Sequence, residues 1–212
     1  MKNEITERRS ALIAEKVIKH LKARNMEGYF AHDRNEALDI ALSLIPEGCS
    51  VGWGGSVSIN EIGLKQAIID GNYRQIDRDS AKNPTERMSL MKQALVSDVF
   101  IMGTNAITED GQLVNVDGLG NRVAALTFGP DSVIVIAGMN KLVPTLDDAI
   151  ARARKHAAPI NAMRFTGTAC QQDGACHDCT MEGCICGKIV VTRFDMVRGR
   201  VKVILVDEDL GY

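Results

Sequence analysis

The sequence predicts an α/β fold with a mixed, mainly parallel sheet and helices on both faces of that sheet. Short apolar strand candidates alternate with helical segments along most of the 212-residue chain, which favours parallel strands joined by crossover helices. Ser132–Gly138 is uniformly apolar and β-branched, as in a central strand covered on both faces. A candidate hairpin and a pair of strand candidates near the C-terminus are expected to make the sheet mixed.

The first seventy residues are expected to form three helices and two strands. Apolar residues recur at helical spacing between charged ones in the first segment, which indicates an amphipathic helix. A second helical segment stops before Pro46, since the residue before a proline disfavours helix. In chain order we expect a helix over 4–25, a strand over 29–31, a helix over 35–42, a strand over 49–53 and a helix over 59–70.

The remainder of the chain predicts a second set of alternating elements. Asp110-Gly111 between two apolar segments is a hairpin turn signal, and Pro159 is expected to end a helix. Because the sequence contains no internal repeat and no obvious linker, we predict a single domain over 1–212. The expected elements are a helix over 84–96, a strand over 98–103, a hairpin over 106–118, helices over 121–126 and 146–156, a strand over 132–138, and paired strands over 188–192 and 200–206.

Charge and composition narrow the class of partner. Lys and Arg number 25 against 27 Asp and Glu, and aromatic residues make up 4% of the chain. A nucleic-acid binder usually has a basic excess and aromatic stacking residues, so we expect no nucleic-acid partner. Charges interrupt the N-terminal segment, which is therefore no signal peptide, and no apolar run nears the roughly 18 residues of a membrane span. We expect a cytoplasmic protein without a membrane partner.

Five of the six cysteines lie in one loop, at about 166–187. Buried cysteines that serve packing alone would be scattered through the core, and clustered thiols in a reducing compartment favour metal ligation over disulfides. Cys176 and Cys179 form a C-x2-C pair that can reach one metal from a tight turn. Cys170 precedes the pair, and Cys184 or Cys186 follows, with Cys186 the better spaced.

The loop predicts a metal centre, with two alternatives left open. Four thiolates suit either zinc or an iron–sulfur cluster, and the expected ligands are Cys170, Cys176, Cys179 and Cys186. His177 is a less favoured ligand, because it lies inside the C-x2-C turn. The alternatives are reduced, exposed thiols without a metal, and a redox-active disulfide pair.

A second candidate site is the glycine turn Gly54-Gly55-Ser56 after the strand over 49–53. Glycine allows the backbone to approach a ligand closely, and the hydroxyls of Ser56 and Ser58 add donors. The turn lacks the ending of a P-loop and the spacing of a dinucleotide fingerprint. We expect it to bind a phosphate or carboxylate; tight turn geometry alone is the alternative.

A third candidate is the polar segment 115–122. It combines Asn115, Asp117 and Asn121 with two glycines and Arg122, a density beyond the needs of one turn. Asp117 could act as a base or bind a hydroxyl, and Arg122 could pair with an anion. The alternative is a hydrogen-bonded loop in which Arg122 pairs with Asp117.

Two further charged residues are candidates on either side of the same cleft. Glu61 follows the glycine turn, where it either caps the helix or lines the cleft. Lys141 follows the expected central strand and could reach the carboxyl edge of the sheet, where open α/β proteins usually bind ligands.

Three stretches of the chain together resemble the LUD domain of lactate-utilisation proteins, the group that includes lactate-utilisation protein C. They are Gly54–Ser56 with Glu61–Leu64, then Ile107–Lys141, then Val203–Gly211. The resemblance implies a fold similar to the sugar-phosphate isomerase and CoA-transferase group, with a cleft lined by glycine turns. Carried over by position, the cleft residues are Gly54, Gly55, Ser56, Glu61, Asn115, Asp117, Asn121, Arg122 and Lys141.

The resemblance also suggests a function. The LUD family is linked to oxidation of L-lactate to pyruvate, in which such a subunit accompanies iron–sulfur partners. The cysteine loop looks like a variant of short LUD proteins, in which Cys170, Cys176, Cys179 and Cys186 recur while Cys184 is replaceable.

Three hypotheses follow. The first is an accessory or electron-transfer component of 2-hydroxy-acid oxidation that holds a small anionic ligand and a metal or iron–sulfur centre. The alternative is a stand-alone enzyme or binding protein for a phosphorylated sugar, nucleotide or acyl-CoA, with structural zinc and with Glu61 or Asp117 as general base. The third is a scaffold whose zinc pins the loop for a partner. A homodimer is a further expectation, as for many soluble proteins.

Overall fold

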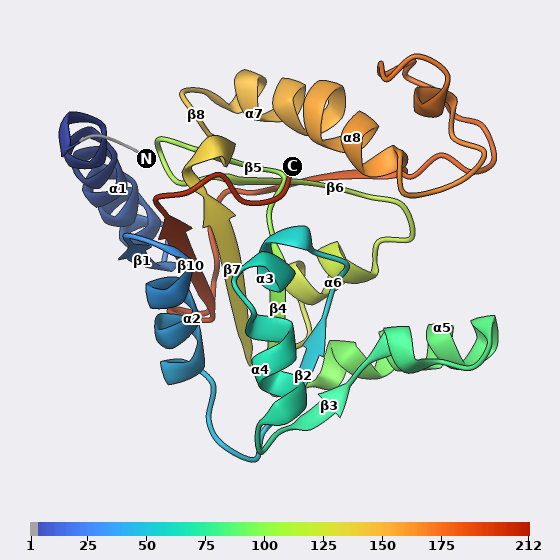
Figure 1. Cartoon of the computed structure of the whole chain (residues 1–212), viewed down its shortest axis with the longest axis horizontal. Helices are drawn as coiled ribbons and strands as arrows, with labels where there is room; N and C mark the ends of the chain where they lie inside the picture. The colour runs from blue at the N-terminus through green and yellow to red at the C-terminus, as the bar shows by residue number, and fades with distance from the viewer. Residues whose placement is uncertain (1–3) are drawn as a thin grey trace.

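The protein, as described by a computed structural model over residues 4–212, is built around a parallel six-stranded sheet (Figure 1). Its strand order is β1-β10-β7-β4-β2-β3, and every neighbouring pair is parallel. The mainly parallel α/β fold expected from the sequence is confirmed. The strands are β1 Glu27–Ala31, β2 Ser50–Trp53, β3 Arg74–Ile76, β4 Val99–Gly103, β7 Ser132–Gly138 and β10 Val201–Val206.

Helices cover both faces of this sheet because its strands are apolar on both faces. Alternate residues of β7, such as Val133 and Ile134, enter separate buried clusters on opposite faces. Leu21 of the first helix and Leu126 belong to one cluster, and Ile68 belongs to the other. The helices are α1 Glu4–Ala23, α2 Arg34–Ser43, α3 Val57–Glu61, α4 Leu64–Asp70, α5 Pro84–Gln93, α6 Asn121–Thr127, α7 Leu146–Arg152 and α8 Ala158–Ala162.

A smaller sheet lies across the carboxyl ends of the central strands and under α7 and α8 (Figure 1). Its order is β8-β5-β6-β9. The predicted hairpin is confirmed, with Ile107 opposite Leu113 in an antiparallel pair. Small residues of α7 and α8 pack on this sheet and form a third buried cluster. The strands are β5 Ala106–Thr108, β6 Leu113–Asp117, β8 Leu142–Val143 and β9 Lys188–Thr192.

The expected pairing of the two C-terminal strands is wrong. β9 is an edge strand that pairs antiparallel with β6 in the small sheet, whereas β10 lies between β1 and β7 in the central sheet. Side-chain burial explains the separation. β10 is almost wholly buried, as an interior parallel strand must be, while β9 is largely exposed.

Three expected helices also differ in detail. Gly63, at a φ of 76°, divides the helix expected over 59–70 into α3 and α4. The helix expected over 84–96 ends at Gln93 and continues as one 3-10 turn. Pro159 does not end the helix expected over 146–156. It lies in the first turn of α8, because a wide π-turn over Ala153–Ala157 precedes it and accommodates its missing N–H. The strands β3 and β8 were not expected.

The topology places a crevice beside β2. From β2 the chain runs outward to β3 at the sheet edge, then returns to β4 on the opposite side of β2. In open parallel sheets, ligands bind outside the carboxyl ends of the strands where the winding reverses in this way. No helix within residues 4–212 is long and apolar enough to cross a membrane.

Candidate functional site

A cavity of about 420 Å³ lies where the topology predicts it, beyond the carboxyl ends of β2 and β4. Most of the site residues expected from the sequence line it. These are Gly54, Gly55, Ser56, Asp117, Asn121, Arg122 and Lys141. Glu61 and Asn115 are not among the lining residues: Glu61 is exposed, and Asn115 is buried.

Arg122 forms the floor of the cavity and is committed to the protein itself. Its side chain is 12% exposed. Its Nη1 donates to the Gly103 carbonyl at 3.0 Å and to Asn115 Oδ1 at 2.5 Å. Its Nη2 donates to Asn105 Oδ1 at 3.0 Å and to the Val116 carbonyl at 2.7 Å. All four terminal N–H groups are therefore used within the fold, which makes Arg122 a structural cation rather than a free anion-binding group.

Asp117, Asn115 and Glu61 also make specific contacts within the fold. Asp117 Oδ1 accepts from the Gly120 N–H at 3.0 Å, and its Oδ2 lies 3.6 Å from Arg122 Nε. Asn115 is fully buried and orients Arg122. Glu61 Oε2 accepts from the Gly211 N–H at 2.7 Å. Of the two carboxylates expected to act as bases, Asp117 is the one that reaches the cavity.

The glycine turn makes room for two arginines. A Cβ on Gly54 would lie 2.9 Å from Cδ of Arg122, and a Cβ on Gly55 would lie 2.5 Å from Nη2 of Arg78. Ser56 caps the short helix α3, where its Oγ accepts from the Ile59 N–H at 3.4 Å. The two glycines thus permit guanidinium groups to approach the backbone closely.

Arg78, which the sequence analysis missed, is the most under-paired cation of the cavity. Its side chain is 16% exposed, and its Nε has no hydrogen-bond partner among residues 4–212. Its Nη1 reaches only Met91 Sδ, at 3.8 Å, and its Nε lies 3.7 Å from Asp79 Oδ1. Burial lowers the pKa of Arg78, which reflects a guanidinium short of stabilising partners. A bound anion would supply the missing acceptors.

The cavity as a whole is cationic. Six cations and two carboxylates line it among the described residues, so an anion is the ligand that its charge favours. Asp79 is partly neutralised, because Lys65 and Arg87 lie 3.0 and 3.1 Å from it. No spacing or motif in the sequence predicts that Lys65, Arg78, Arg87 and Arg164 lie in this cavity. The cations are Lys65, Arg78, Arg87, Arg122, Lys141 and Arg164, and the carboxylates are Asp79 and Asp117.

Lys141 lies at the deep end of the cavity and is 3% exposed. Its Nζ donates to Ser58 Oγ at 2.7 Å, and Ser58 in turn donates to the Leu210 carbonyl at 3.3 Å. Burial, together with the charges of Arg152 and Arg122, lowers the pKa of Lys141 to about 7. This amine therefore titrates near neutral pH.

The cysteine loop follows α8 and contains one short turn, Ala169–Gln171. None of its cysteines forms a disulfide. Burial, together with the thiols of Cys184, Cys170, Cys176 and Cys179, raises the pKa of Cys186 to about 12. The five thiols are thus close enough to influence one another.

The loop fits a thiolate-bound metal by its donor set. Thiolates are ligands of both zinc and iron–sulfur clusters. Cys184 Sγ accepts from the Cys186 N–H at 3.4 Å, and His177 bonds to Asp173 Oδ1 at 2.9 Å rather than joining the thiols. Within residues 4–212 no group of three or more His, Cys, Asp or Glu side chains is already arranged around a common point.

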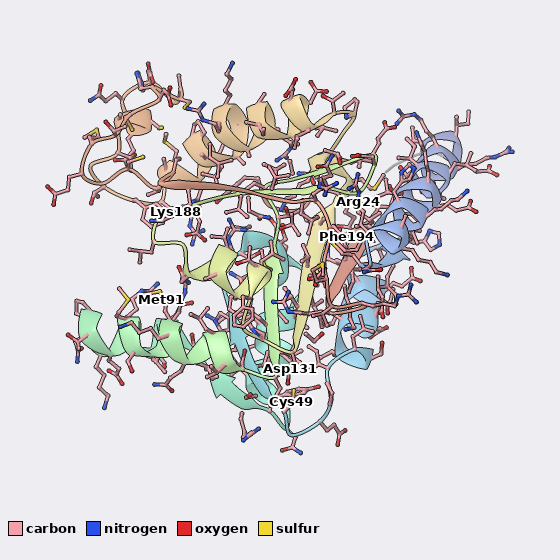
Figure 2. The ribbon with its side chains drawn as sticks, turned by 180° about the vertical axis from the view of Figure 1, so that it is seen from behind. Arg24, Cys49, Met91, Asp131, Lys188 and Phe194 are labelled. Atoms are coloured by element: carbon pink, nitrogen blue, oxygen red, sulfur yellow. The ribbon has the colours of Figure 1, made fainter. Side chains whose placement is uncertain are left out.

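The cysteine loop and the cavity share a wall. Ile185, between Cys184 and Cys186, lines the cavity. Its Cα would lie 3.4 Å from a Cβ on Gly118, which is van der Waals contact, so the loop packs against the polar segment at this point. Figure 2 shows Lys188, which follows the loop, and Met91 of the cavity on the same side of the molecule.

Comparisons with known proteins agree with this architecture. The family model of the LUD domain matches residues 14–206. None of the curated proteins matches the chain. A DUF162 family protein from Deinococcus radiodurans is similar in structure, with a TM-score of 0.53 at 13% identity, over 93% of this chain and 98% of the other. At this identity the similarity shows the fold alone.

Two further structures overlap with about half of the chain. Ribose 5-phosphate isomerase A from Methanocaldococcus jannaschii has a TM-score of 0.35 at 18% identity, over 53% of this chain and 55% of the other. The eIF2B beta protein from Chaetomium thermophilum has a TM-score of 0.37 at 17% identity, over 54% of this chain and 44% of the other.

Proposed function

The chain belongs to the LUD domain family, and we propose that it is an accessory or electron-transfer component in the oxidation of a 2-hydroxy acid such as L-lactate. The observation that carries this proposal is the shared wall between the cationic cavity and the cysteine loop. A small carboxylate bound there would lie in the same cavity that Ile185 of the cysteine loop lines. Such proximity is what transfer of electrons between a substrate and a redox centre requires.

The cavity would bind the acid through its carboxylate. Arg78 has an unpaired Nε and a largely buried guanidinium, so a carboxylate would complete its hydrogen bonds in a bidentate pair. Arg122 would act indirectly, because it fixes the floor against which the ligand packs. Asp117 lines the cavity and would accept a proton from a hydroxyl group of the ligand.

The cysteine loop would hold the redox centre. Cys170, Cys176, Cys179 and Cys186 are the proposed ligands of an iron–sulfur cluster, with Cys184 as the spare thiol. A cluster of this kind supplies one-electron transfer. Oxidation of a hydroxyl to a carbonyl releases two electrons, so they would have to pass onward, and iron–sulfur partner subunits are the proposed acceptors.

Metal analysis tests the redox part of the proposal. Protein purified without oxygen is expected to contain iron and acid-labile sulfide, and both should be lost in a Cys176→Ser, Cys179→Ser double variant. Cys49→Ser is the matched control, because Cys49 lies outside the loop. Zinc without sulfide in the anaerobic protein would exclude electron transfer by this chain.

Ligand binding tests the cavity separately. L-lactate and pyruvate are expected to raise the melting temperature, because a ligand that binds only the folded state stabilises it. Arg78→Met should abolish the shift. No shift with either acid would contradict the assignment to 2-hydroxy acids.

A phosphorylated ligand with structural zinc is the second candidate, and one observation favours it. Lys65, Arg78, Arg87 and Arg164 are more cations than a single carboxylate needs, and a phosphate group carries greater charge. Under this alternative, a sugar phosphate, a nucleotide or an acyl-CoA would raise the melting temperature more than L-lactate does. The same thermal-shift series therefore distinguishes the two functions.

A further inference from the structure

Lys141 is an amine without a carboxylate partner at the deep end of the cavity. Its side chain is 3% exposed, and its one hydrogen bond among the described residues goes to the neutral hydroxyl of Ser58. Its surroundings are cationic, because Arg152 on α7 and Arg122 on α6 both act on it. The nearby carboxylate, Glu61 on α3, is engaged by the Gly211 N–H.

This environment favours the uncharged amine. Burial and two neighbouring guanidinium groups lower the pKa of Lys141 to about 7, whereas a solvated lysine has a pKa of about 10.4. A large fraction of the Lys141 side chains is therefore neutral at physiological pH. A lysine that served only to attract an anion would be better placed beside a carboxylate, where it would stay charged. Desolvated lysines of this kind act as nucleophiles toward carbonyl groups.

The hydrogen bonds of Ser58 orient the amine. Ser58 Oγ accepts from Lys141 Nζ at 2.7 Å and donates to the Leu210 carbonyl at 3.3 Å. In the neutral amine, this leaves the nitrogen lone pair free for a ligand. A Cβ at Gly103 would lie 3.5 Å from the same Ser58 oxygen and 2.7 Å from Ser56 Oγ. Glycine at this position therefore keeps space open beside the hydroxyls and the amine.

We propose that Lys141 forms an imine with the carbonyl group of a 2-oxo acid held in the cavity, an inference that rests on the proposed function and extends it. The Lys141 nitrogen attacks the carbonyl carbon, and a C–N bond forms. The carbonyl C–O bond breaks, and its oxygen leaves as water with the two amine protons. The step is neutral in electrons and needs no further reactant. A 2-hydroxy acid has no keto group at C2 and cannot form the imine, so Lys141 distinguishes the oxidised acid from the reduced one.

Reductive trapping tests the imine directly. The protein is incubated with pyruvate, treated with sodium borohydride and analysed by intact mass spectrometry and peptide mapping. We expect one reduced pyruvate unit per chain, on the peptide that contains Lys141, and none after incubation with L-lactate. Lys65 is an internal control, since it lines the same cavity but is paired with Asp79. Ser58→Ala should slow trapping, because it removes the group that orients the amine.

Binding is measured in the same samples, so that the two proposals can fail separately. Lys141→Arg removes the amine nucleophile and is expected to bind pyruvate without forming an adduct; if it does not fold, the peptide map of the unaltered protein still decides. A pyruvate-induced rise in melting temperature with no adduct on Lys141 would overturn the imine and leave the proposed function standing. The absence of both the rise and the adduct would overturn both. An adduct on Lys141 in protein without iron or sulfide would support the imine and contradict the redox role.

Discussion

The floor of the cavity and the cysteine loop are neighbours, yet they are held by different forces. The floor is built from buried residues of β4 and β6, and Arg122 ties these two strands and the loop residue Asn105 together through four hydrogen bonds. The loop has mainly local hydrogen bonds, such as Gly174 N–H to the Cys170 carbonyl at 2.8 Å, and most of its residues are exposed. Contacts between distant segments of the chain position the floor, whereas the hydrogen bonds of the loop mostly join residues near one another in the sequence.

The floor and the loop would therefore be ordered in different ways. A floor that is already ordered can bind a ligand without a rearrangement, since its cost in conformational entropy was met during folding. The loop gathers its donors within a short stretch of sequence, so a metal can order it locally. Substitutions in the two regions should therefore affect different properties of the protein.

Arg122→Met is expected to have the largest effect. It removes a buried cation and leaves the Asn115 and Asn105 side chains without their donor, which should lower the free energy of unfolding by about 3–5 kcal/mol. Urea unfolding followed by circular dichroism measures this change. Arg164→Met is the control, because Arg164 lines the same cavity but is exposed and bonds only to Asn161 at 3.3 Å. We expect it to stay within about 0.5 kcal/mol of the unaltered protein, and equal losses in both variants would contradict the structural role of Arg122.

Gly54→Ala should lower the stability of the protein, whereas Gly55→Ala should weaken anion binding. A Cβ at position 54 meets the packed stem of Arg122, so unfolding should become easier by about 1–3 kcal/mol. A Cβ at position 55 meets the far end of Arg78, which can move, so stability should change little while anion binding weakens. Urea unfolding and calorimetric titration with L-lactate measure the two effects. The reverse assignment, with Gly55→Ala the less stable variant, would show that Arg78 is the more rigid of the two arginines.

Arg78→Met should weaken anion binding without loss of stability. Removal of a hydrogen bond to a charged ligand lowers affinity by about 10- to 100-fold. The free energy of unfolding should hold or rise, since a buried and under-paired guanidinium is replaced by an apolar side chain. Arg74→Met removes the same charge at an exposed position outside the cavity and is the control for calorimetry. If both variants bind L-lactate equally well, the anion does not bind at Arg78.

These residues also show how much of the molecule could be predicted from its sequence. The parallel sheet and the hairpin could be predicted from local apolar patterns. The glycine turn could be predicted from its own residues, Gly54-Gly55-Ser56. The cations Arg78, Arg87 and Arg164 could not be predicted, because they converge on the cavity only through tertiary packing.

Other differences between sequence and structure have local causes. β9 and β10 are close in the chain but lie in different sheets, since burial on both faces selects β10 for the central sheet. The structural role of Arg122 was one of two alternatives that the sequence left open. The choice between them required the positions of Gly103, Asn105 and Val116, which are distributed over two strands and a loop.

Lys141 should make both L-lactate binding and pyruvate trapping depend on pH. Its pKa in the folded protein is about 7, so the amine is charged below that pH and neutral above it. The affinity for L-lactate should fall as pH rises from 6 to 8, by at most about tenfold per pH unit because one proton is involved. Trapping of pyruvate should increase over the same range, since the neutral amine is the nucleophile. The charged groups that act on the amine are Arg152, Arg122 and Glu61. A Lys141→Met variant should lose the pH dependence of L-lactate binding, and a steep dependence in that variant would assign it to another group.

The smallest effect on global stability is expected from the loop itself. In metal-free protein, the Cys176→Ser, Cys179→Ser double variant should unfold within about 0.5 kcal/mol of the unaltered chain, because these side chains lie outside the buried clusters. Unfolding can be followed through the single tryptophan, Trp53, which is buried at the end of β2. In metal-loaded protein, a glutamate-specific protease should cut at Glu182, the one glutamate of the loop, much more slowly in the unaltered chain than in the variant. If the metal-free variant instead unfolded several kcal/mol more easily, the loop would be part of the folded core, and its order would not depend on a bound centre.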